Sequence, residues 1–381
     1  MNTENNVSDT EKKSVVNSKS LDEVKYLPGF DVLRVIACLG ILFLHFSNYA
    51  CPDGVYFGKF LLDPQGSSYD FNLFVEVFFA LSGFFAYAYV GKIEKGLTFK
   101  RFFLPKVIRI VPMLIISTVV LEIALWQLVC SGNAQGVEIY KPSLWGMVSA
   151  CFGFEYICGF DNANINRESW YIDLLLLCYI VLYLIIKVSK RKQLDWRWLC
   201  VFLSVGGSIC VMQGWTIPFL GVLNGRAYAA FFIGLLLADY FTGRTFSVKH
   251  YVLAGTVLFV FAFLLVFYPD SLIYGKTCVV TYLVIPALFL SFRSDTVSKL
   301  LSFKLIKWIS DVSYSTYLFH VTLIIAVFIV TDKLGFQIDY AHEVMLFFFW
   351  IVSFAFGGIA YCLVERPLTC RLNKIFSGEK K

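Results

Sequence analysis

Long apolar stretches separated by short polar loops run along most of the chain. A transmembrane α-helix needs roughly 17 to 25 predominantly apolar residues to cross the hydrocarbon core of a bilayer. Ten stretches fit this requirement, at about residues 31–50, 71–91, 107–129, 170–187, 196–213, 217–241, 251–268, 277–292, 309–330 and 343–364. The pattern therefore predicts an all-α, polytopic transmembrane helical bundle of about ten spans.

A further apolar segment, residues 143–159, is ambiguous because a glycine and a glutamate interrupt it. Cytoplasmic loops carry an excess of Lys and Arg, so the basic clusters can decide whether it crosses. The basic clusters at residues 92–109 and 187–197 lie on the same side of the membrane only if residues 143–159 do not cross it. We therefore predict ten spans with both termini cytoplasmic, and a re-entrant or interfacial segment within an outer loop of residues 130–169.

Composition supports the membrane assignment. Hydrophobic residues make up 58% of the chain and charged residues only 16%, a balance that a water-soluble globule could not bury in one core. Residues 1–26 are polar and lack the apolar run of a signal peptide, so we expect a disordered cytoplasmic tail. The membrane domain then covers residues 27–368, and residues 369–381 form a short cytoplasmic C-terminal tail.

The charge and the metal-binding residue types exclude two classes of partner. The net charge of +6 comes from basic residues in short loops rather than from one patch, so we expect no nucleic acid. The four His residues show no metal-site spacing and no C-x-x-C pair is present, so we also expect no metal.

The first span carries ionisable side chains, which are costly inside a membrane and therefore indicate function. Arg34 and His45 are eleven positions apart, which places them within about 20° of the same helix face and about 16 Å apart along the axis. Asn48 follows His45 by one turn. This face offers a cation that can bind an anion and, farther along, a proton acceptor. The structural alternative is a snorkelling Arg and a His hydrogen-bonded between helices.

The second span contains a carboxylate and a small-residue pair. Glu76 lies at the depth of His45, so its carboxylate could fix the tautomer of that imidazole. On position alone, Glu76 could equally reach water at the interface. Ser82 and Gly83 lie near the middle of the span. Small residues there are more typical of close helix packing than of a nucleophilic serine.

Two later spans supply further polar candidates. Tyr314, Tyr317 and His320 follow one another along one face of the ninth span, where they either pack or line a channel for a substrate. Arg226 lies at the outer mouth of the sixth span. It either binds an anionic or hydroxyl-rich acceptor or anchors the helix at the interface.

Together these residues form an ordered set of motifs. The pattern D-x-x-R-x(10)-H (Asp31, Arg34, His45) is followed by FFALSGF, by RIVP at residues 109–112, by SWYIDLLLLCYI, by SYSTYLFH and by VERP at residues 364–367. The set resembles the acyltransferase 3 family over about residues 28–368. The resemblance implies a ten-span domain that takes acyl-CoA, often acetyl-CoA, and modifies extracytoplasmic or lipid-linked glycans in bacteria. It also implies that His45 is the central catalytic residue and Arg34 an essential partner.

Two features depart from the family pattern. Many members carry a soluble extracytoplasmic hydrolase-like domain after the last span, whereas about sixteen residues follow it here. Any acyl hand-off to such a domain would therefore involve a separate extracytoplasmic protein. The block after Trp170 keeps Asp173 but has Leu where many members have Glu two positions later.

The motifs and the chemistry lead to one hypothesis: acyl transfer from cytoplasmic acyl-CoA to a glycan or polyprenyl-linked glycan hydroxyl in a bacterial plasma membrane. We expect Arg34, Arg109 and Arg366, helped by Lys106, to hold the CoA phosphates. His45 then acts as general base or as a transient acyl carrier.

The other candidates take supporting roles in this hypothesis. The expected catalytic supports are Glu76, Tyr314 and Ser82, and the expected substrate-binding residues are Arg226, Asn48, Tyr317 and His320. Tyr314, Ser82 and Asn48 are the candidate donors to the tetrahedral oxyanion.

Two other classes of function remain open. Polar groups along a membrane pathway are also typical of a transporter or flippase of a glycan or lipid-linked intermediate. Such carriers often show paired discontinuous helices in two related halves, which this sequence lacks. A catalytically idle scaffold in a glycan-assembly complex is the third possibility, which the presence of both Arg34 and His45 disfavours.

Overall fold

The computed structural model describes residues 27–64, 70–130, 144–153, 156, 169–268 and 275–377. The expected N-terminal tail and most of the outer loop lie outside the described residues. The first half contains α2 (Pro28–Ala50), η1 (Phe71–Leu73), α3 (Phe74–Ala86), η2 (Tyr87–Tyr89), α4 (Val90–Glu94), α5 (Phe99–Cys130), α6 (Leu144–Phe152) and α7 (Trp170–Lys192). A small antiparallel hairpin, β1 (Val55–Phe57) and β2 (Phe60–Leu62), follows α2.

The second half is also helical. It contains α8 (Trp196–Met212), α9 (Val222–Phe241), α10 (Val248–Phe267), α11 (Lys276–Val279), η5 (Val280–Val284), α12 (Ile285–Arg293), α13 (Asp295–Leu300), α14 (Lys304–Leu334), α15 (Glu343–Ala360), η6 (Tyr361–Glu365) and α16 (Arg366–Ser377). The segments η5 and η6 are π-helical insertions that continue the neighbouring α-helices.

The structure confirms the all-α polytopic bundle. Within the described residues, nine helical runs are long and apolar enough to cross a membrane, and α8 is a shorter apolar helix of 17 residues. Together they account for the ten expected spans. Helix α6, in the ambiguous segment, has only nine residues. It is about 14 Å long, much shorter than the hydrocarbon core of about 30 Å. The rest of that segment lies largely outside the described residues.

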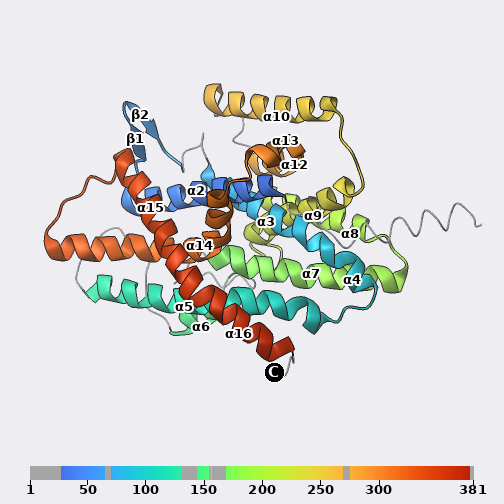
Figure 1. Cartoon of the computed structure of the whole chain (residues 1–381), viewed down its shortest axis with the longest axis horizontal. Helices are drawn as coiled ribbons and strands as arrows, with labels where there is room; N and C mark the ends of the chain where they lie inside the picture. Colours follow the sequence, from blue (N-terminus) through green and yellow to red (C-terminus); the bar gives the residue numbers. More distant parts are fainter. Residues whose placement is uncertain are drawn as a thin grey trace, which may run out of the picture.

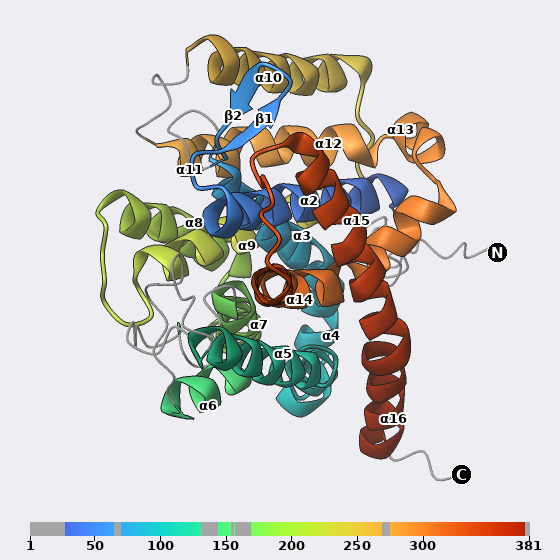
Figure 2. The same ribbon diagram turned by 90° about the vertical axis from the view of Figure 1, so that its left-hand side faces the viewer.

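Helix α14 occupies the centre of the bundle. It packs against α2, α5 and α15. Figure 2 shows it nearly end-on, with α2 above it, α5 and α7 below it and α15 beside it. In the perpendicular view of Figure 1, α2, α5, α7 and α14 run in roughly the same direction, and α15 and α16 cross them obliquely. Polar side chains on α14 can therefore meet partners on several helices.

Helices α3 and α9 touch backbone to backbone. A Cβ atom added to Gly83 would lie 1.9 Å from the carbonyl oxygen of Phe231, and one added to Gly234 would lie 2.0 Å from that of Ala80. No side chain fits at either position, so glycine is what allows this approach. The expectation that the small residues of the second span mark close helix packing is confirmed for Gly83.

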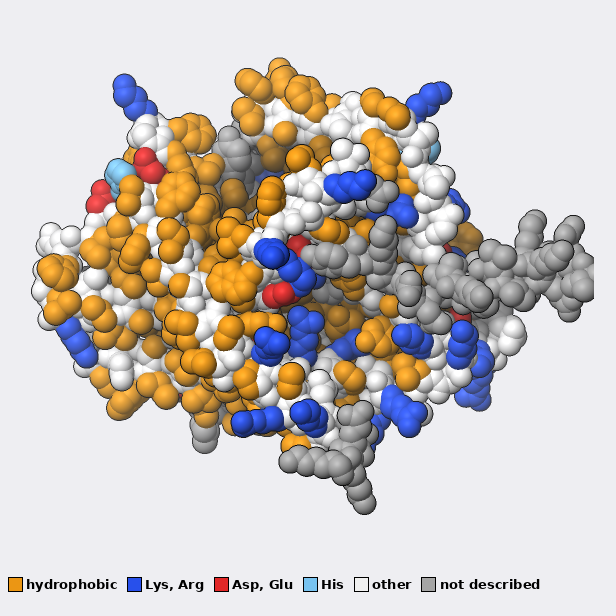
Figure 3. Space-filling model, viewed as in Figure 1, with side chains coloured by type: hydrophobic (Ala, Val, Ile, Leu, Met, Phe, Trp, Pro, Cys, Tyr) orange, Lys and Arg blue, Asp and Glu red, His pale blue; other side chains and the backbone are white. Residues whose placement is uncertain are grey.

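The two basic loops lie at one end of the bundle. Lys190 Nζ donates to the carbonyl oxygen of Glu94 at 2.6 Å, and the Tyr183 hydroxyl donates to that of Leu97 at 3.1 Å. Most Lys and Arg side chains in Figure 3 gather toward the centre and right of the view, the side where α4 and α7 meet in Figure 1. This arrangement supports the prediction that both loops share one side of the membrane.

Candidate active site

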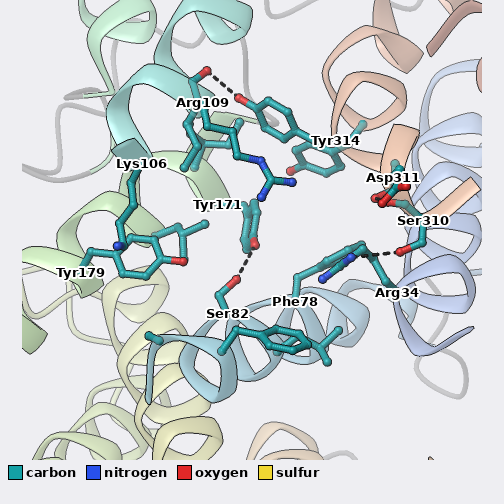
Figure 4. Close-up of a pocket in the computed structure, with 18 of the residues that line it drawn as sticks. Arg34, Phe78, Ser82, Lys106, Arg109, Tyr171, Tyr179, Ser310, Asp311 and Tyr314 are labelled. Carbon is teal, nitrogen blue, oxygen red and sulfur yellow. Dashed lines mark hydrogen bonds between the residues drawn. The ribbon is translucent and has the colours of Figure 1, made fainter. Parts of the chain in front are cut away.

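A cavity of about 560 Å³ lies among α2, α3, α5, α7 and α14. Basic, aromatic and hydroxyl side chains point into it from all five helices (Figure 4). Several of the predicted site residues line it: Arg34, Ser82, Lys106, Arg109, Tyr314 and Tyr317. The bundle therefore brings together side chains that lie more than 280 residues apart in the sequence.

Arg34 is held in place by a short polar chain between α2 and α14. Its Nη1 donates to Ser310 Oγ at 3.0 Å, and Ser310 Oγ donates to Asp31 Oδ1 at 2.7 Å. The same Nη1 lies 3.5 Å from Asp31 Oδ1, one turn back on its own helix. The Asp and Arg of the first motif thus act together, and Ser310 links them. The guanidinium is oriented before any ligand arrives.

Lys106 and Arg109 contribute two further cations from α5. Figure 4 shows the guanidinium of Arg109 pointing into the cavity between Tyr171 and Tyr314. Lys106 Nζ lies 3.8 Å from the ring centroid of Tyr89 and donates to the carbonyl oxygen of Phe102 at 3.0 Å. Such cation–π contacts stabilise an ammonium group that is partly removed from water. The carboxylates of Asp31 and Asp311 also line the cavity, where Asp31 contacts Arg34 and Asp311 contacts Lys307, so Lys106 and Arg109 supply its excess of positive charge.

Hydroxyl groups and aromatic rings form the deeper wall. Ser82 Oγ and the Tyr171 hydroxyl share a hydrogen bond of 3.3 Å, and the Tyr171 and Tyr317 rings meet edge to face at 5.9 Å. The Tyr314 hydroxyl donates to the carbonyl oxygen of Ile110 at 2.7 Å. The Tyr314 hydroxyl is thus bonded to a backbone carbonyl, whereas the hydroxyls of Ser82 and Tyr171 bond to each other.

Two buried histidines lie directly behind Tyr317. His45 Nδ1 and His320 Nε2 are 2.5 Å apart, and the two rings lie edge to edge, with their centroids 4.8 Å apart. The ring of Tyr317 lies 5.6 Å from that of His320, and Tyr317 also lines the cavity. Neither histidine is among the residues that line the cavity. The Tyr317 side chain therefore lies between the cavity and the imidazole pair.

Glu76 has a different partner from the one expected. Its Oε1 accepts from Arg226 Nε at 2.6 Å, and its Oε2 accepts from Arg226 Nη2 at 2.9 Å. Arg226 Nη2 also donates to the carbonyl oxygen of Asn72 at 2.8 Å, and its guanidinium lies over the ring of Trp170. Glu76 faces α9, whereas His45 meets α14. The two expected roles, an orienting carboxylate and an acceptor-binding arginine, are replaced by one buried ion pair.

Two other expected site residues lie apart from the cavity. Arg366 is exposed on α16 and does not line it, whereas its neighbour Glu365 is buried and accepts a hydrogen bond from Ser315 Oγ at 2.6 Å. The π-helical segment η6 ends at Glu365 and shifts the helix phase there. Asn48 is exposed near the end of α2, one turn beyond His45.

Three residues of the site were not predicted from the sequence: Tyr171, Ser310 and Glu365. Tyr171 and Glu365 lie inside quoted motif blocks, SWYIDLLLLCYI and VERP, so their position in these blocks was an available signal. Ser310 lies three residues before the block SYSTYLFH and carried no signal of its own.

Comparison with known proteins identifies the family. The family model of the acyltransferase domain of acyltransferase 3 proteins matches residues 27–364. No match was found among curated proteins or among solved structures. The matched region contains the whole cavity, both histidines and every transmembrane helix up to η6. This multi-pass membrane protein is therefore an O-acyltransferase, and the chain belongs to the acyltransferase 3 family.

Proposed function

We propose that the enzyme transfers an acyl group, most simply acetyl, from cytoplasmic acyl-CoA to a hydroxyl of a cell-surface or lipid-linked glycan in a bacterial plasma membrane. One observation carries this proposal: a cavity lined by Arg34, Lys106 and Arg109 leads to an aromatic wall, and an imidazole pair lies directly behind that wall. The shape matches a donor that is anionic at one end and reactive at the other.

The cations suit the phosphates of CoA. Arg34, Lys106 and Arg109 offer charge-assisted hydrogen bonds, which are stronger than those between neutral groups. The two arginines can also bind phosphate oxygens in pairs because their guanidinium groups are planar forks. The uncharged pantetheine arm can then extend along the aromatic wall. It has to cover the separation between Arg34 and His45, about 16 Å along α2.

His45 is the group that would activate the acceptor. Its imidazole removes the proton of the acceptor hydroxyl while the oxygen attacks the thioester carbonyl. The tetrahedral intermediate collapses, the C–S bond breaks, and the imidazolium returns the proton to the CoA thiolate. The hydroxyls of Ser82 and Tyr171 are the candidate donors to the transient oxyanion. In the alternative route, His45 first carries the acyl group on its ring nitrogen.

Radiolabelled acetyl-CoA tests the proposal directly. Full-length protein in nanodiscs is incubated with the labelled donor and a panel of polyprenyl-linked and free glycans, and the products are separated. We expect label on a glycan, stable to protein removal, and no glycan label with His45→Gln. Binding of CoA without transfer to any acceptor, from either acetyl or longer acyl donors, would contradict the proposed reaction. Label on an added extracytoplasmic protein would instead assign the acceptor role to that protein.

Rapid acid quenching separates the two routes. If His45 carries the acyl group, label accumulates on the wild-type protein when the acceptor is omitted, and the bond is labile to hydroxylamine. If His45 is a general base, no label is retained by the protein. The variant His45→Gln provides the background in both cases.

A further inference from the structure

His320 is buried against His45, and the sequence assigned it only to the substrate channel. We propose that His320 is a positioning residue that fixes the tautomer of His45, so that the Nε2 atom of His45 carries the lone pair needed for base catalysis. The inference rests on the proposed function in one respect, namely that His45 is the base. The tautomer itself follows from contacts within the protein.

The first step concerns the backbone carbonyl of Tyr317. His320 Nδ1 lies at hydrogen-bond distance from this oxygen, one turn back on α14. A carbonyl oxygen can only accept, so Nδ1 of His320 must carry the hydrogen. A neutral imidazole has one protonated and one unprotonated nitrogen. Nε2 of His320 is therefore the acceptor atom of the ring.

The second step carries the same logic to His45. The acceptor Nε2 of His320 lies 2.5 Å from Nδ1 of His45. Two lone pairs cannot face each other at this distance, so Nδ1 of His45 is the donor. The remaining nitrogen of His45, Nε2, is then the unprotonated one. A single carbonyl thus sets the hydrogen positions of both rings, through a chain that runs from Tyr317 to His320 to His45.

The arrangement also favours the proton transfer. When His45 takes a proton from an acceptor hydroxyl, its ring becomes an imidazolium, and its Nδ1–H bond becomes a stronger donor. His320 Nε2 already lies in position to accept it. Serine hydrolases use a carboxylate for the corresponding task of holding the imidazole in the right tautomer. Here Glu76, the carboxylate at a suitable depth, is bound to Arg226.

Packing alone does not explain these contacts. Both histidines are buried, at 7% and 0% relative exposure. The rings are nearly parallel, with 20° between their planes. A hydrophobic side chain of similar size on α14 would fill the same space. It would leave Nδ1 of His45 without this acceptor, which is costly inside a protein.

Two substitutions at His320 separate its two contacts. His320→Gln places an amide oxygen near the position of Nε2, where it can still accept from His45, but it gives up the contact to the Tyr317 carbonyl. His320→Asn places its amide near Nδ1, where it can still donate to Tyr317, but it is too short to reach His45. The exposed His250 on α10 provides the matched control, His250→Gln.

The kinetic test measures kcat and KM separately for each variant and compares both with the wild-type values. We expect His320→Asn to lower kcat by about 10²-fold or more and to leave KM for acetyl-CoA within about threefold of wild type. We expect His320→Gln to retain kcat within about tenfold. Near-normal kcat in folded His320→Asn would overturn the proposal, and so would equal losses in the Asn and Gln variants. CoA binding and size-exclusion profiles establish that each variant is folded.

A spectroscopic readout needs neither donor nor acceptor. The ring ¹⁵N shifts of histidine-labelled protein distinguish protonated from unprotonated nitrogens, and His45→Gln assigns the signals. At alkaline pH, with both rings neutral, we expect His45 protonated on Nδ1 in the wild type and mixed between tautomers in His320→Asn. Protonation of wild-type His45 on Nε2 would overturn the inference even if the enzyme is active. The correct tautomer in a protein that transfers no acyl group would leave the inference standing and reject the proposed function.

Discussion

Arg226 binds both carboxylate oxygens of Glu76, at 2.6 and 2.9 Å, and so joins α9 to α3, two helices that also meet at their glycines. The Glu76 side chain is fully buried and that of Arg226 is 11% exposed. A buried charge that loses its partner is strongly destabilising, whereas an apolar replacement of the whole pair can be neutral. The pair therefore belongs to the scaffold of the site.

The first prediction follows from this pair. Arg226→Met alone should destabilise the protein by about 3–5 kcal/mol, because Glu76 is left as an unpaired buried charge. The double variant Glu76→Leu/Arg226→Met should recover most of that loss. Thermal unfolding in detergent, followed by size-exclusion fluorescence, measures both. If the double variant is as unstable as the single one, the pair acts through more than its mutual charge.

The second prediction concerns donor binding at Arg34. Arg34→Ala should weaken CoA binding by about ten- to hundredfold, because a hydrogen bond to a charged group contributes about 1.5–3 kcal/mol. Arg34→Lys should lose less, since it keeps the charge but not the planar fork. Isothermal titration with CoA gives the affinities. Arg371, exposed on α16, supplies the control variant Arg371→Ala. Unchanged affinity in both Arg34 variants would remove this residue from the donor site.

The third prediction concerns His45. His45→Gln should lower the rate of acyl transfer by about 10²- to 10⁴-fold, because the amide keeps hydrogen bonds but cannot take the hydroxyl proton. CoA affinity should stay at the wild-type value, since His45 does not line the cavity. Turnover is measured with labelled acetyl-CoA and affinity by titration. A well-folded variant with near-normal turnover would exclude His45 as the base.

The fourth prediction concerns topology. In a cysteine-depleted background, single cysteines at Gly96 and Gln193 should react with an impermeant maleimide only from the cytoplasmic side. The contact between Lys190 and Glu94 places these two loops at the same end. Asp53, exposed beside the β1–β2 hairpin, should be labelled from the outside. Labelling of Gly96 and Gln193 from opposite sides would contradict the ten-span arrangement.

The sequence predicts the spans well because the physical cause is local. An apolar run long enough to cross a bilayer must form a helix there, since its backbone groups find no other partners in lipid. Each of the ten expected spans accordingly has its helix. The depth of a residue in the membrane follows from its position along its span. Arg34, Lys106 and Arg109 were therefore expected together, and the structure gathers them around one cavity.

The sequence predicts contacts between spans less well, because depth does not say which helices are neighbours. Glu76 and His45 share a depth, but the Glu76 face of α3 meets α9, where Arg226 is the partner. His45 and His320 were both candidates, yet their pairing depends on the packing of α2 against α14. Arg366 follows a π-helical insertion that changes the helix phase, and it is exposed on α16 and does not line the cavity.

The backbone contact between Gly83 and Phe231 has a consequence for how the two helices can move. With no side chains between them, α3 and α9 cannot slide past each other without a clash of main chains. We therefore expect the two helices to move as one body, so that Ser82 on α3 keeps its place relative to α9. A larger side chain at position 83 or 234 should push the two helices apart and shift the wall of the cavity that Ser82 lines.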